Sequence, residues 1–134
     1  MLVHFPSALY PFSLVMDFFF WFTKTEVYAA AATYALYGAV GMSTLALIYG
    51  VIDFLQLDPK SKAWKIAGIH ALLNSTWFII YAALLFYIVK HGFASVGLPY
   101  LIIMTLTTCG LIFSNFLGAE LIIKYRIGVQ SEKE

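Results

Sequence analysis

Two histidines, two carboxylates and one amide lie within or at the edge of long apolar runs, where such groups are costly. These residues are His4, Asp53, His70, Asn74 and Glu120. Two imidazoles on different helices can bind a haem iron from its two faces. The same imidazoles, together with two carboxylates, can instead bind zinc, iron or manganese. Either chemistry requires a fold that brings these residues together.

Four apolar runs are each long enough to cross a bilayer, which takes about 20 helical residues. They cover residues 4–23, 27–57, 64–89 and 98–123, and a charged tail follows at 124–134. Only 11% of the residues are charged and 62% are hydrophobic, so charges cannot cover the surface of a soluble domain. The connections are short, which favours antiparallel neighbours. The sequence therefore predicts an all-α membrane protein, a single-domain bundle of four transmembrane helices in up-down-up-down order.

This order places one candidate side chain from each helix at the same level of the bundle. His4 begins the first helix, Asp53 lies near the end of the second, and Glu120 lies near the end of the fourth. His70 lies in the second turn of the third helix, and Asn74 follows one turn later on the same face. We expect His4 and His70, supported by Asn74, to bind a haem. For a metal ion, we expect His4, Asp53, His70 and Glu120 as ligands.

Three uses of this cluster remain open at this point. The first is a b-type haem in an electron-transfer protein or accessory subunit that exchanges electrons with a membrane redox partner. The second is a transition metal ion without haem. The third is no cofactor, in a structural or accessory subunit whose helices are held together by a polar network. We favour a bound cofactor over none, because hydrogen bonds between helices in membranes average only about 0.6 kcal/mol, which is little stability for so many polar groups. The haem is our first hypothesis, although the metal ion would use the same imidazoles.

Small residues recur along the second helix and predict a close contact between helices. We expect this stripe to face lipid, where it can pack against a partner helix or a second copy of the chain. Its members are Ala31, Ala35, Ala39, Gly38 and Gly41.

Positive charge predicts the orientation in the membrane. Lys60, Lys62, Lys65, Lys124, Arg126 and Lys133 lie on the side of both termini, whereas Lys24 and Lys90 lie on the other side. Basic residues favour the cytoplasmic side, so we expect both termini in the cytoplasm of a bacterium and the helices in its inner membrane. Asp17 lies towards the other side, where we expect it to pair with Lys24 or Lys90.

Several functional classes are not supported by the sequence. It has no Ser-His-Asp or Cys-His arrangement at a plausible depth and no glycine-rich phosphate loop, so we expect no enzyme of these kinds. Nucleic acid is not an expected partner, because the net charge is +1 and there is no basic stripe. The single cysteine, Cys109, cannot form an internal disulfide.

Four short motifs, one on each helix, resemble a family of bacterial predicted membrane proteins known as domain of unknown function 2231. The segment from His4 to Leu9 is similar to its His-Phe-Pro-x-Ala-Leu opening. The other matching segments are Gly50-Val51-Ile52-Asp53-Phe54, His70-Ala71-Leu72-Leu73-Asn74, and Gly118-Ala119-Glu120-Leu121 followed by Ile127-Gly128-Val129. The resemblance covers nearly the whole chain. It implies a four-helix membrane fold and marks the same five polar residues, but it implies no activity. In one departure, Tyr125 replaces a histidine that the family often carries.

Overall fold

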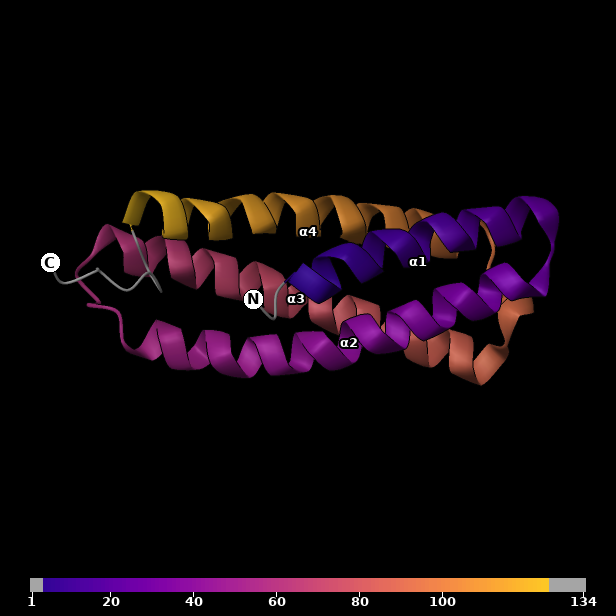
Figure 1. Cartoon of the computed structure of the whole chain (residues 1–134), viewed down its shortest axis with the longest axis horizontal. Helices are drawn as coiled ribbons and strands as arrows, with labels where there is room; N and C mark the ends of the chain where they lie inside the picture. The colour runs from indigo at the N-terminus through magenta and orange to yellow at the C-terminus, as the bar shows by residue number, and fades with distance from the viewer. Residues whose placement is uncertain (1–3, 126–134) are drawn as a thin grey trace, which may run out of the picture.

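Four long α-helices lie side by side along one axis in an antiparallel bundle (Figure 1). The computed structural model describes residues 4–125. The helices are α1 (His4–Thr23), α2 (Glu26–Leu55), α3 (Lys62–His91) and α4 (Leu98–Tyr125), and a short 3-10 helix, η1 (Phe93–Ser95), precedes α4. Within the described residues there is no strand. The predicted all-α four-helix bundle is confirmed, and each helix is long and apolar enough to cross a membrane.

The turn between α2 and α3 shows why α3 begins two residues earlier than the sequence predicts. The Ser61 hydroxyl accepts a hydrogen bond of 3.0 Å from the backbone N–H of Trp64 and so caps the helix. Lys62 therefore starts the first turn. Earlier in the same turn, the Asp58 carboxylate accepts a hydrogen bond of 2.9 Å from the backbone N–H of Lys60, which fixes the turn.

Large apolar side chains cover the outside of the bundle. Phe22 is 73% exposed, Leu72 69% and Ile123 80%, and many other aromatic and aliphatic side chains are exposed with them. Soluble monomers rarely expose apolar surface so extensively. This surface matches the hydrocarbon of a lipid bilayer, in agreement with the composition.

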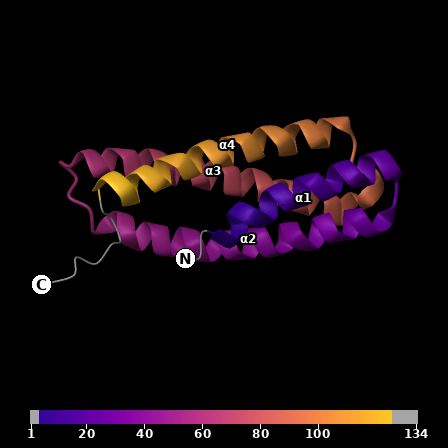
Figure 2. The ribbon, with the colours of Figure 1, turned by 45° about the horizontal axis from the view of Figure 1, so that its top comes forward.

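The helices differ in length, and α1 is the shortest. It has 20 residues, whereas α2 and α3 have 30 each and α4 has 28. In both ribbon views α1 begins partway along the bundle, so that one end contains only α2, α3 and α4 (Figures 1 and 2). The side chains at that end lack the neighbours that a full-length first helix would supply.

Small residues on α2 allow α1 to approach closely. Ala35 and Ala39 are buried within the bundle, and a Cβ atom at Gly38 would lie 3.3 Å from the Leu9 side chain on α1. The Ser13 hydroxyl donates a hydrogen bond of 3.0 Å to the Ala32 carbonyl across the same contact. The prediction that this stripe faces lipid is therefore wrong for Ala35 and Ala39, because contacts within the chain cover them.

We expect Ala39→Leu to destabilise the bundle by about 1–3 kcal/mol, because Ala39 has no exposed surface and a larger side chain must displace its neighbours. The matched control is Gly41→Leu, since Gly41 is exposed and has nothing within 4 Å of its Cβ position. Thermal unfolding of both variants in the same detergent measures the effect. Equal melting temperatures for Ala39→Leu and the parent would contradict this packing.

Candidate functional site

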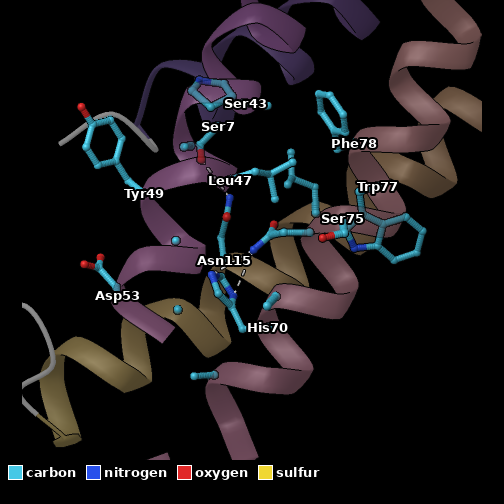
Figure 3. A pocket seen from close by; sticks show the side chains of 18 of the residues that line it. Ser7, Ser43, Leu47, Tyr49, Asp53, His70, Ser75, Trp77, Phe78 and Asn115 are labelled. Atoms are coloured by element: carbon cyan, nitrogen blue, oxygen red, sulfur yellow. Dashed lines mark hydrogen bonds between the residues drawn. The ribbon is translucent and has the colours of Figure 1, made fainter. Parts of the chain in front are cut away.

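A cavity of about 980 Å³ lies between the helices at the end where α1 is missing (Figure 3). It is lined by the first turns of α1, the second half of α2, the first two thirds of α3 and the second half of α4. Most of the lining is apolar, and a few polar side chains converge on it. This size and lining are typical of pockets that bind small molecules or cofactors, which measure about 300–1,000 Å³.

His70 is a half-buried residue of α3 in the wall of this cavity. Its Nδ1 atom lies 2.8 Å from the Ser114 carbonyl oxygen of α4, which can only accept a hydrogen bond. We therefore assign the ring proton to Nδ1. The other nitrogen, Nε2, lies 2.9 Å from the side-chain nitrogen of Asn74 and accepts its hydrogen bond. An imidazole held in this way by a backbone carbonyl is oriented to bind a metal through Nε2 in place of Asn74.

Gly118 on α4 provides the space that the His70 ring occupies. A Cβ atom at this position would lie 2.7 Å from Cε1 and 3.2 Å from Nε2 of His70, which is too close for either atom to stay in place. The sequence analysis included Gly118 only in a motif and assigned it no role. Its role depends on which faces of α3 and α4 contact each other, and the sequence does not specify those faces.

The structure brings four of the five predicted site residues to one cavity. His4, Asp53, His70 and Asn74 all line it, although His4 and Asp53 are largely exposed. Figure 3 shows Asp53 on α2 and His70 on α3 at the same end of the pocket. These positions agree with the expected convergence of the helices at one level.

Glu120 is arranged differently from this expectation. Its carboxylate accepts a hydrogen bond of 2.9 Å from the Lys124 ammonium one turn along α4, and it is not among the residues that line the cavity. Across residues 4–125, no three His, Cys, Asp or Glu side chains are grouped closely enough to hold a metal ion. The four-ligand metal set remains a prediction that this arrangement does not support.

Asn115 and Ser7 join α4 to the first turns of α1. The Asn115 side-chain nitrogen donates a hydrogen bond of 3.0 Å to the Ser7 hydroxyl, and both residues line the cavity (Figure 3). His4 precedes Ser7 by three residues on the same helix, so this hydrogen bond also helps to fix the position of His4. The polarity of Asn115 inside an apolar run marks it as unusual, but the sequence does not identify its partner.

Asp17 lies away from the cavity, and its partner differs from the lysine that the sequence analysis predicts. Its side chain is buried in the bundle, where Oδ2 accepts a hydrogen bond of 3.3 Å from the Tyr100 hydroxyl of α4. The Lys24 ammonium instead lies over the rings of Phe20 and Trp21, at 5.9 and 5.8 Å from their centroids. Within residues 4–125 the one salt bridge joins Lys124 and Glu120, so the predicted pairing of Asp17 with a lysine is wrong.

The fold and the cavity together define a small helical membrane protein with a mostly apolar pocket, bordered by a few polar side chains, at one end of its bundle. The chain belongs to a protein family described as predicted membrane protein (DUF2231), whose model matches residues 1–131. The resemblance found in the sequence motifs is therefore confirmed. Neither the curated proteins nor the solved structures include a match. The family description specifies the membrane but no reaction or ligand.

We expect Gly118→Ala to displace the His70 ring and destabilise the protein by about 1–3 kcal/mol, because the new methyl group overlaps the imidazole. Gly50→Ala is the control, since Gly50 has nothing within 4 Å of its Cβ position. Thermal unfolding reports stability, and NMR of ¹⁵N-labelled histidine reports the Nδ1–H signal of His70. An unchanged His70 signal in Gly118→Ala would contradict this contact.

Proposed function

We propose that the protein binds one b-type haem in this cavity and acts as an electron-transfer protein or accessory redox subunit of the bacterial inner membrane. The observation that carries the proposal is the state of His70. Its Nδ1–H donates to the Ser114 carbonyl, so that Nε2 carries the lone pair at the wall of a large, mostly apolar cavity. Haem iron is commonly held by such an imidazole.

The second axial ligand in this proposal is His4. It lines the same cavity from α1 and is anchored through the Ser7–Asn115 hydrogen bond one turn away. The Asn74 side chain is hydrogen-bonded to Nε2 of His70. When haem binds, this hydrogen bond would break so that Nε2 can bind the iron, and Asn74 would remain beside His70. Asp53 adds a carboxylate near the mouth of the cavity, where it can offset positive charge.

The number of histidines limits the redox role. The chain has three, and the third, His91, is exposed at the opposite end of α3, where its ring lies 4.8 Å from that of Tyr87. One pair of histidines supports one haem, whereas an electron path across a membrane usually uses two. The proposed role is therefore exchange of electrons with a membrane redox partner.

A cofactor-free role is the second candidate, and the hydrogen bonds between helices favour it. His70 with Ser114, Asn115 with Ser7, and Tyr10 with Ser43 each join two helices around the cavity. These bonds join the helices in pairs and help to hold the bundle in register. In this case the protein would be a structural or accessory subunit, and the cavity would bind no cofactor.

We expect the purified protein to show a sharp Soret band and a reduced α-band after dithionite is added, and His70→Ala to lose both. His4→Ala should weaken or shift them, because the iron would lose one axial ligand. His91→Ala, at the far end of α3, is the control and should retain the parent spectrum. Metal analysis of the same samples separates the candidates.

A colourless parent with stoichiometric transition metal would replace the haem with a metal ion. A colourless and metal-free parent would exclude both cofactors and support the cofactor-free role. Equal haem in His70→Ala and the parent would refute the assigned site.

We further propose that the cavity end of the bundle faces the cytoplasm. The described residues at that end include Lys60, Lys62, Lys65 and Lys124, against Lys24 and Lys90 at the other end. In a Cys109→Ser background, we expect an impermeant thiol reagent to label Lys90→Cys in intact cells and Lys60→Cys only after permeabilisation. The reverse labelling pattern would place the cavity on the outer side.

A further inference from the structure

The cavity opens on the side of the bundle where α1 is missing. α1 packs against both α2 and α4, whereas α2 and α4 have no extensive contact with each other. Beyond the start of α1 at His4, no described helix fills the space between α2 and α4 (Figures 1 and 2). Val51 on α2 and Ile122 on α4 both line the cavity and are each 56% exposed. They therefore mark the two edges of the opening.

Apolar side chains border this opening on the outer surface of the bundle. Ile52 and Leu55 on α2 are exposed, and so is Ile123 on α4. Together with Val51 and Ile122 they continue the apolar surface that matches the hydrocarbon of a bilayer. A molecule dissolved in the bilayer can therefore reach the cavity from the side without first entering water.

Two polar side chains of α2 lie at this opening. Tyr49 and Asp53 are exposed, line the cavity and lie one helical turn apart, and Figure 3 shows both on the same side of α2. Neither the Tyr49 hydroxyl nor the Asp53 carboxylate has a hydrogen bond or salt bridge with another of residues 4–125. A carboxylate accepts hydrogen bonds, whereas a tyrosine hydroxyl can both donate and accept them. The pair suits a ligand with two oxygen atoms, at least one of them in a hydroxyl group.

The charges around the cavity limit which lipid can bind at this opening. Asp53 is the one acidic residue of the described lining, and no Lys or Arg of residues 4–125 lines the cavity. A phospholipid carries a phosphate in its head, which the Asp53 carboxylate repels and no cation of the lining attracts. An acyl chain alone would leave Tyr49 and Asp53 without hydrogen bonds. A neutral, lipid-soluble ring that carries hydroxyl groups meets both conditions.

We propose that this opening binds a lipid-soluble quinol, in which one ring hydroxyl group donates a hydrogen bond to Asp53 and the other ring oxygen is hydrogen-bonded to Tyr49. Its apolar tail remains in the surrounding lipid. The binding itself does not depend on a haem, whereas the electron transfer rests on the proposed function. In that step one quinol reduces two ferric haem irons by one electron each, becomes the quinone and releases two protons to water. The quinol is then the membrane redox partner.

Photochemical labelling in phosphatidylcholine proteoliposomes tests the binding. The probe is a quinol with a diazirine on its tail next to the ring, and mass spectrometry of peptides locates the label. We expect label on residues 46–57 and 115–123, and excess unlabelled quinol should suppress it. The quinone form should compete about tenfold less well, because its ring oxygens cannot donate a hydrogen bond to Asp53.

Two results of this experiment would overturn the proposal. One is label that is spread evenly over lipid-facing residues or that persists with excess unlabelled quinol. The other is label that phosphatidylethanolamine suppresses as well as the quinol does, because the opening would then bind a phospholipid head.

Variants of the two polar residues test their assigned contacts, with the midpoint of the quinol competition as the measure. We expect Asp53→Asn to bind the quinol about tenfold more weakly, because it loses a charged acceptor, and Tyr49→Phe about threefold more weakly, because it loses a neutral hydrogen bond. Glu26→Gln and Tyr34→Phe alter exposed residues elsewhere on α2 and should match the parent. An unchanged midpoint in Asp53→Asn would refute the site.

A kinetic measurement separates this proposal from the haem itself. We expect anaerobic addition of quinol to the oxidised protein to produce the reduced α-band, and Tyr49→Phe to slow this reduction about threefold while dithionite still reduces the haem fully. A protein that contains haem but does not bind the quinol would refute the quinol site and leave the haem in place. A haem-free protein that the quinol labels at the opening would refute the haem and support the quinol site. A haem that dithionite reduces and the bound quinol does not would contradict the electron transfer.

Discussion

The length of α1 determines most of what is unusual in this bundle. With 20 residues beside partners of 28 and 30, it leaves one end of the bundle with three helices, and the cavity lies there. Because α1 begins at this level, His4 lies in the cavity wall on the first turn of a helix. Ser7 on the next turn bonds to Asn115 and fixes where α1 begins relative to α4. A longer first helix would fill the space that the other helices leave open.

Hydrogen bonds between helices are the second determinant of the structure. Within a bilayer, apolar side chains are already surrounded by lipid, so the hydrophobic effect does not drive the helices together. Packing and polar contacts must therefore specify how the helices fit together. The small residues of α2 allow the backbones of α1 and α2 to approach, and the Ser13 hydroxyl can then reach the Ala32 carbonyl. Gly118 plays the same part between α3 and α4, where His70 reaches the Ser114 carbonyl. Close packing and polar bonding therefore depend on each other at both interfaces.

The sequence predicted the number of helices and their order because hydrophobic runs and short turns are properties of the chain itself. The convergence of His4, Asp53, His70 and Asn74 on one cavity followed from counting residues along antiparallel helices. The outcomes for Glu120 and Asp17 depend on the rotation of each helix about its axis. That rotation is set by packing with other helices. Because each helix is apolar on all its faces, the sequence pattern does not show which face points into the bundle. The contact of Gly118 with His70 and the hydrogen bond of Asn115 to Ser7 could not be predicted for the same reason, because each depends on which residues of a neighbouring helix lie opposite.

The position of the cavity has an electrical consequence. A cavity that admits water or a polar ligand from one side extends the high-dielectric phase into the bundle. With water in the cavity, the membrane voltage would fall mainly across the closely packed part, between the Tyr10–Tyr81 stack and the end of α1 at Thr23. One elementary charge that crosses the full potential changes in energy by about 2.3 kcal/mol per 100 mV. A charge that moves only through this packed part would experience most of that energy, so the short first helix concentrates the electric field on the core of the bundle.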